Sequence, residues 1–168
     1  LEAASVKRCG SDFGLCYSPE FIAIGDVVNG LLKPAFFLVG EHDRRSGDLL
    51  ESIYRRAQSA DDAATPAIPI VRMSIVNAEL TKIAVNAFVT SKISFANTLC
   101  RVCGALPGGD AHTVAHAVGL DRRIGGRYLL PGATFGGPCF PRDNRAFEWF
   151  ARSVGADAPL ARATDEVN

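Results

Sequence analysis

Short apolar runs that end at proline or glycine mark the first part of the chain. The runs "GLCYSPEF" (14–21), "PAFFLVG" (34–40) and "AIPIVRMS" (67–74) have the length and boundaries of buried strands. Between the last two, residues 43–60 place apolar side chains at helical spacing, with charged side chains on the opposite face. Strand, helix and strand without a hairpin turn predict parallel pairing in an α/β layer, with a sheet that looks incomplete.

The pattern changes at Ser74. Residues 74–104 contain no proline, and no glycine before Gly104, so the sequence predicts one long helix with Ser74 as its N-cap. Its apolar residues occupy nearly the whole circumference of the helix. This pattern is typical of a helix buried on most sides, within a domain or against a second subunit. Such a helix is roughly 45 Å long, more than one small domain can bury. We therefore expect a homodimer interface along 74–104.

The remainder of the chain predicts shorter helical elements. They are a helix over 110–120, a glycine-rich loop over 123–137, a helix beginning near Pro141 and the start of a further helix over 158–168. The expected fold class is therefore α/β followed by all-α. The expected boundary separates residues 1–73 from residues 74–168.

Composition narrows the functional classes. The 168 residues are 48% hydrophobic and carry 18 basic and 18 acidic side chains, so the formal net charge is zero. This balance argues against a nucleic-acid or membrane-surface partner. No apolar run is long enough to span a bilayer, and no signal peptide opens the chain. The five cysteines are an odd number in a chain too large to need disulfides, so we expect reduced thiols and a cytoplasmic location.

The stretch "FGGPCFPRD" (135–143) holds a cysteine in an unusual setting. Pro141 at the start of a helix places Cys139 at or just before the helix N-terminus, where unpaired N–H groups and the helix dipole favour a thiolate. Gly136 allows close approach of a substrate to the backbone. Asp143 lies within one helical turn. Cys139 is thus a candidate nucleophile, and the alternative is a structural cysteine beside a tight turn.

A second candidate cluster lies on the long helix. Glu79, Lys82 and Asn86 fall at i, i+3 and i+7, which places them on one helical face. Burying an ammonium is costly unless it is paired, so Lys82 is either an edge residue or a functional one. The "CRVC" at 100–103 has the spacing of half a zinc or redox site, but the sequence has no second half. His112 and His116 have the spacing of two metal ligands but lack a third, so no metal site is predicted.

Taken together, five segments of the chain resemble the UDP-glucose/GDP-mannose 6-dehydrogenase family, and UDP-glucose 6-dehydrogenases most closely. They are "YSPEF", "GEHDRRSGDLLESIYR", "AELTKIAVNAFVTSKISFANTLC", "LDRRIGGRYLLPG" and "FGGPCFPRDNRAF". The resemblance implies that 1–73 is the truncated C-terminal part of a Rossmann NAD-binding domain with a parallel sheet. It implies that 74–168 is a helical dimerisation and substrate domain. The chain would then be the middle of a longer enzyme and inactive alone.

The resemblance also implies a reaction and residue roles. Such enzymes oxidise the C6 alcohol of a nucleotide sugar to a carboxylate with two NAD⁺. Cys139 would trap the aldehyde as a thiohemiacetal and then form a thioester. Lys82 and Asn86 would stabilise the oxyanion. Asp143 would hold a water or Lys82, and Glu20 would act as a general base in hydrolysis. Glu20 and Cys139 would also contact NAD. Residues implied to bind the sugar nucleotide are Phe21, Ile22, Arg123 (reaching the substrate of the partner subunit), Tyr128, Leu129, Phe135 and Gly136.

Two departures from the family pattern leave the substrate open. Ile24 stands where many relatives carry a second glutamate, and Leu130 stands where some carry a lysine near the nucleotide. UDP-glucose is the leading expectation. GDP-mannose and UDP-N-acetyl sugars remain alternatives, as does a dimerisation fragment without activity of its own.

Overall fold

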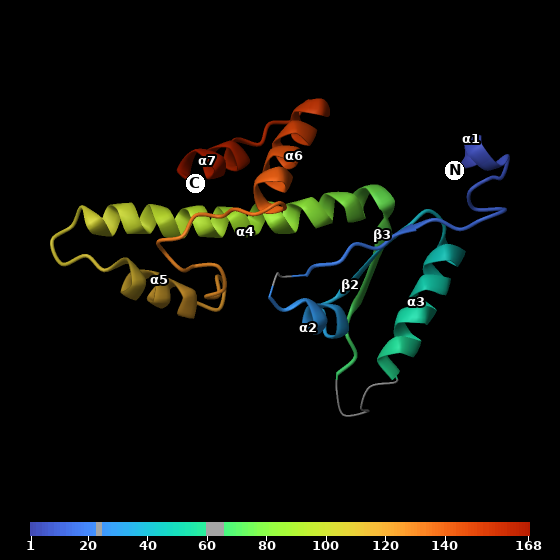
Figure 1. The fold of residues 1–168 in the computed structure, drawn as a ribbon, viewed down its shortest axis with the longest axis horizontal. Helices are drawn as coiled ribbons and strands as arrows, with labels where there is room; N and C mark the ends of the chain where they lie inside the picture. Colours follow the sequence, from blue (N-terminus) through green and yellow to red (C-terminus); the bar gives the residue numbers. More distant parts are fainter. Residues whose placement is uncertain (23–24, 60–65) are drawn as a thin grey trace. The chain divides into compact units, whose positions relative to one another are not determined.

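The computed structural model describes residues 1–22, 25–59 and 66–168. The chain forms two compact units, Leu1–Lys82 and Ile83–Asn168, which divide within helix α4 (Ile75–Gly104). Figure 1 traces the chain through both units. Ile24 lies outside the described residues.

The first unit contains a three-stranded sheet in the order β1 (Cys16–Tyr17), β2 (Phe37–Glu41), β3 (Ile70–Ser74). Helix α3 (Arg44–Ser59) connects β2 to β3, and these two strands pair in parallel from Phe37↔Ile70 to Glu41↔Ser74. The strand–helix–strand prediction is therefore confirmed for this pair. Strand β2 has a neighbour on each side, α3 packs against it, and its residues Leu38 and Val39 are fully buried.

The expectation of a wholly parallel sheet is wrong for β1. This strand pairs antiparallel with β2, with Cys16 opposite Glu41 and Tyr17 opposite Gly40. The prediction relied on the lack of a tight hairpin turn. A long connection can also reverse the chain, and the described part of this connection contains the short helix α2 (Val27–Leu32). A further short helix, α1 (Glu2–Ser5), precedes the sheet.

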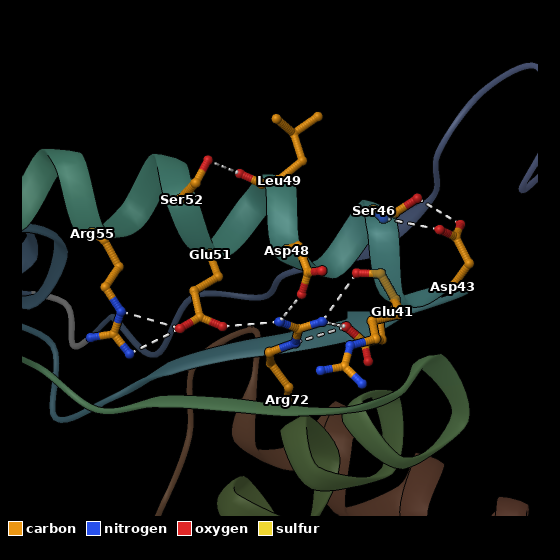
Figure 2. A network of polar contacts seen from close by, with 10 residues as sticks. Glu41, Asp43, Ser46, Asp48, Leu49, Glu51, Ser52, Arg55 and Arg72 are labelled. Carbon is orange, nitrogen blue, oxygen red and sulfur yellow. Dashed lines mark hydrogen bonds and ion pairs between the residues drawn. The ribbon is translucent and has the colours of Figure 1, made fainter.

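Arg72 on β3 joins the sheet to α3 through a network of ion pairs (Figure 2). Its guanidinium donates to Glu41 Oε2 at 2.6 and 2.8 Å, to Asp48 Oδ1 at 2.6 Å and to Glu51 Oε2 at 3.0 Å. A Cβ at Gly47 would overlap the Glu41 carboxylate, so a glycine is needed where α3 passes this network. These contacts fix the register of α3 against the parallel strand pair.

Helix α4 begins and ends as predicted. The Ser74 hydroxyl accepts a 3.4 Å hydrogen bond from the Asn77 N–H, which satisfies one of the unpaired donors of the first turn. The helix continues without interruption to Gly104.

The two faces of α4 within the second unit differ in an unexpected way. Its buried side chains are mostly small or polar: Ala87, Thr90, Ser94, Ala96, Asn97 and Cys103. Its large apolar side chains Phe88, Phe95 and Val102 are 67%, 51% and 52% exposed. These three side chains are therefore uncovered in the single chain, although the sequence predicted a helix buried on most sides.

The rest of the second unit is helical. Helix α5 (Ala111–Leu120) is capped by Asp110, whose carboxylate accepts from the His112 N–H at 3.0 Å. A long loop leads to α6 (Phe140–Ser153), which packs on α7 (Pro159–Val167). Buried Asn144 on α6 donates to the Ala161 carbonyl at 2.8 Å and to Asp165 at 2.9 Å. This amide therefore ties α6 to α7 beneath a small alanine-rich core.

Candidate active site

Cys139 occupies the N-cap of α6 and is exposed. Pro141 follows in the first turn, and the Asp143 N–H donates to the Cys139 carbonyl at 2.8 Å, the first hydrogen bond of the helix. The sequence had predicted this position from Pro141. The thiol thus lies at the positive end of the helix dipole and is open to solvent.

Asp143 is buried, and both of its oxygens accept hydrogen bonds. Asn86 Nδ2 donates to Oδ2 at 2.6 Å, and Arg142 Nε donates to Oδ1 at 2.8 Å. The hydrogen bond from Arg142 to Asp143 raises the pKa of Arg142. The structure therefore brings Asn86, Asp143 and Cys139 together around the first turn of α6.

Lys82 lies among residues of the "SPEF" segment in the first unit. Its ammonium donates a 2.6 Å hydrogen bond to the backbone carbonyl of Glu20 and lies 4.6 Å from the centroid of the Phe21 ring. The Phe21 ring in turn contacts Phe36 at 4.9 Å between centroids. The ammonium is paired with a carbonyl and an aromatic face, which meets the cost of its partial burial.

Sequence reasoning missed the residues that hold this segment. The Ser18 hydroxyl donates to the Leu38 carbonyl at 2.9 Å and lies 2.6 Å from the Tyr54 hydroxyl. Because a serine has one hydroxyl proton, Tyr54 is the donor of the second bond. Arg142 was missed as well, although its place directly before Asp143 in "PRD" could have suggested it.

Arg123 and Tyr128 lie on the loop between α5 and α6. Arg123 is exposed and forms a 2.6 Å ion pair with Asp121, and the hydrogen bond from Arg123 lowers the pKa of Asp121. Tyr128 has φ 64°, a left-handed conformation that is uncommon for a residue with a Cβ. Its side chain is partly exposed.

Other residues implied to bind substrate differ in exposure. The Leu129 and Phe135 side chains are only 6% and 5% exposed, so they form part of the core. Gly136 has open space where a Cβ would be. Glu20 and Ile22 are exposed in the first unit. At Gly136 the loop before Cys139 therefore presents its backbone to solvent.

The first unit also contains a hollow of about 610 Å³ between residues 10–18 and α3. None of the predicted site residues lines it. Within the described residues, no group of three or more His, Cys, Asp or Glu side chains could hold a metal ion. No helix among them has both the length and the apolar character needed to cross a bilayer. All five cysteines are free thiols.

Comparison with known proteins identifies the family. Residues 76–168 match the UDP-glucose/GDP-mannose dehydrogenase family, central domain. The chain is 38% identical to UDP-glucose 6-dehydrogenase AglM of Haloferax volcanii over 168 residues, which is 100% of this chain and 38% of that protein. It is 35% identical over 162 residues to a GDP-mannose 6-dehydrogenase of Pseudomonas syringae pv. tomato, covering 95% of this chain and 35% of that protein.

Solved structures agree with this result. A UDP-glucose dehydrogenase from Pyrobaculum islandicum superposes with a TM-score of 0.83 at 37% identity, over 95% of this chain and 34% of that chain. A GDP-mannose dehydrogenase from Pseudomonas aeruginosa gives a TM-score of 0.65 at 31% identity, over 99% of this chain and 36% of that chain. The chain thus spans little more than a third of the length of these relatives. It belongs to the UDP-glucose/GDP-mannose dehydrogenase family and contains the central domain of that family.

Proposed function

We propose that this chain is the central part of a nucleotide-sugar 6-dehydrogenase that oxidises the C6 alcohol of UDP-glucose to the carboxylate of UDP-glucuronate. The main support is the exposed Cys139 at the N-cap of α6, one turn from the carboxylate of Asp143. The likeness to UDP-glucose dehydrogenases supports the choice of substrate.

The proposal includes NAD⁺ as the oxidant, which would accept a hydride in each of the two oxidation steps. In this proposal Glu20 and Cys139, which are both exposed, would each contact the cofactor. The 168 residues contain no GxGxxG loop, so the cofactor phosphates would bind to residues outside this chain.

Cys139 supplies the nucleophile in this proposal. Its thiolate attacks the C6 aldehyde formed by the first oxidation, and a carbon–sulfur bond replaces the carbonyl π bond to give a thiohemiacetal. Loss of hydride and of the hydroxyl proton from that adduct gives a thioester. Water then attacks the thioester carbon, the carbon–sulfur bond breaks, and the carboxylate and free thiol are released.

Lys82 and Asn86 stabilise the oxyanions of these adducts. An ammonium has three N–H donors, and Lys82 uses one of them on the Glu20 carbonyl. An amide has two, and Asn86 uses one of them on Asp143. Both side chains therefore retain donors for a developing negative charge, and they are four residues apart on α4.

Glu20 and Asp143 have separate roles in hydrolysis. Glu20, exposed after Pro19, accepts the proton of the attacking water. Asp143, held by Asn86 and Arg142, orients that water or Lys82. The backbone around Gly136 and the partly exposed ring of Tyr128 contact the sugar nucleotide.

The proposed enzyme is a homodimer through α4. The exposed side chains Phe88, Phe95 and Val102 repeat every seven residues, so they form one apolar stripe along the helix. A second copy presents the same stripe, and antiparallel or parallel pairing of the two would remove it from water. Arg123 of one subunit would then reach the substrate of the other after leaving Asp121.

The decisive experiment measures turnover of the enzyme that contains this chain. NADH formation with UDP-glucose as limiting substrate should reach two NADH per sugar, and Cys139→Ser should lower kcat by at least about 10³-fold. Cys100→Ser, at an exposed cysteine outside the site, is the matched control and should retain full activity. Unchanged turnover in Cys139→Ser would disprove the nucleophile role.

GDP-mannose is the second candidate substrate, because GDP-mannose 6-dehydrogenases match the chain at 35% identity. Parallel assays with UDP-glucose, GDP-mannose and UDP-N-acetylglucosamine compare kcat/KM directly. A higher kcat/KM for GDP-mannose would change the substrate and leave the chemistry of Cys139 unaltered. The 168-residue chain alone should form a dimer without turnover.

A further inference from the structure

The loop between α5 and α6 is fastened to its surroundings by three side chains that have no assigned role. It leaves α5 and returns along α4 to the start of α6 (Figure 1). Lys92 on α4 donates to the carbonyls of Ile124 and Gly125 at 3.1 and 3.0 Å, near the beginning of the loop. Asn97 and Asn168 hold its end.

Asn97 makes a reciprocal contact with the loop backbone. Its Oδ1 accepts from the Gly132 N–H at 2.9 Å, and its Nδ2 donates to the Ala133 carbonyl at 3.0 Å. Turning the amide over would place donor against donor and acceptor against acceptor, so only one orientation fits. The Asn97 side chain is only 9% exposed, and removing it would leave both loop groups unpaired in a partly buried place.

Asn168 makes the same kind of contact two residues further along. Its Oδ1 accepts from the Phe135 N–H at 2.7 Å, and its Nδ2 donates to the Phe135 carbonyl at 2.9 Å. Two amide side chains thus fix the backbone on either side of residue 134. Gly136 and Gly137 follow at once, and Cys139 comes two residues later.

We infer that Asn97 is a positioning residue for nucleotide-sugar binding, an inference that rests on the proposed function. Because the Leu129 and Phe135 side chains are buried, the loop offers a substrate its backbone at Gly136 rather than these side chains. Backbone groups can bind selectively only if they are held in place. Asn97 holds them at Gly132 and Ala133, and Asn168 does so at Phe135.

The test is steady-state kinetics of the enzyme that contains this chain, with Asn97→Ala and Asn97→Asp. Alanine removes both hydrogen bonds, and aspartate places a carboxylate oxygen against the Ala133 carbonyl. Both variants should raise KM for the nucleotide sugar by about tenfold or more, the loss of roughly one to two hydrogen bonds. KM for NAD⁺ should stay within about twofold. Asn77→Asp, at an exposed position of the same helix, is the matched control and should change neither.

A merely structural role would give a different result. Amide hydrogen exchange at Gly132 should quicken in Asn97→Ala, while thermal unfolding reports the folded fraction. An unchanged KM for the nucleotide sugar in folded Asn97→Ala would overturn the inference, as would an equal rise in both KM values. If the wild-type enzyme oxidised no nucleotide sugar, the proposed function would be wrong, and this inference would be wrong with it.

A second variant serves if neither Asn97 variant folds. Lys92→Met removes the anchor at the other end of the loop without opening a buried site. It should raise the same KM by a smaller factor and leave KM for NAD⁺ unchanged. No change in Lys92→Met would count against loop anchoring as a determinant of binding.

Discussion

The side-chain amide of Asn86 donates a 2.6 Å hydrogen bond to Oδ2 of Asp143 and thereby joins α4 to the first turn of α6. The two residues are 57 positions apart in the sequence. Arg142 donates to the other oxygen, so the Asp143 carboxylate has a fixed orientation one turn from Cys139. The orientation of the Asp143 carboxylate depends on a hydrogen-bond donor at position 86, and that dependence can be tested.

Asn86→Asp should place two carboxylates face to face and lower kcat by about 10²- to 10³-fold at neutral pH, the effect of losing an oriented donor. At lower pH one carboxyl binds a proton and can donate again, so activity relative to wild type should rise as pH falls. A pH–rate profile measures this effect. Asn86→Ala cannot regain a donor and should show no such recovery. Equal recovery in the two variants would contradict the role of the Asn86–Asp143 bond.

Cys139 should react faster with iodoacetamide than Cys100, although both are exposed. Cys139 lies at the N-terminus of α6, where the helix dipole stabilises a thiolate, while Cys100 lies near the C-terminus of α4, where it does not. Peptide mass spectrometry at low reagent concentration should show about a three- to thirtyfold difference in rate. Buried Cys103 is the unreactive control. Equal labelling of Cys139 and Cys100 would exclude an activated thiol.

Arg72→Met should destabilise the first unit, and the loss should depend on pH. The hydrogen bond from Arg72, followed by that from Arg55, lowers the pKa of Glu51 from its ordinary value of 4.5. A carboxyl whose folded pKa is depressed adds stability above its unfolded pKa and loses it as pH falls through the folded value. Thermal unfolding should therefore show a deficit of a few degrees at pH 7 that shrinks toward pH 3.

Arg45→Met, at an exposed position on α3, is the control for Arg72→Met and should have little effect at either pH. A deficit in Arg72→Met that stays constant between pH 7 and pH 3 would show that lost packing, rather than the ion pairs, explains the destabilisation.

Substitution in the apolar stripe of α4 should weaken the dimer. Phe88→Glu or Phe95→Glu should raise the dimer dissociation constant by at least about thirtyfold, because a charge would enter the proposed interface. Sedimentation equilibrium measures the constant. Leu160→Glu, at a position that is 66% exposed on α7, should leave it unchanged. If wild type sediments as a monomer at micromolar concentration, the proposed role of α4 is wrong.

Local patterns account for the parts of the structure that were predicted well. The span of α4 followed from the lack of proline and glycine, and the place of Cys139 followed from Pro141 in the first turn of α6. Both depend on backbone preferences of residues close in sequence. The direction of β1 was not predictable in this way, because strand pairing joins residues separated by a long connection.

The candidate site likewise has features that were predicted from local sequence and features that were not. Residue type, spacing and the family resemblance predicted Cys139, Asp143, Lys82 and Asn86 as the residues of the site, and local patterns predicted the elements on which they lie. Their partners became known from the folded chain: Glu20 for Lys82, and Arg142 and Asn86 for Asp143. The tertiary fold also leaves Phe88, Phe95 and Val102 of α4 exposed and places Asn97 against the loop before the cysteine. Residue type and spacing fix what a side chain can donate or accept, whereas its partner depends on which distant backbone folding brings within about 3 Å.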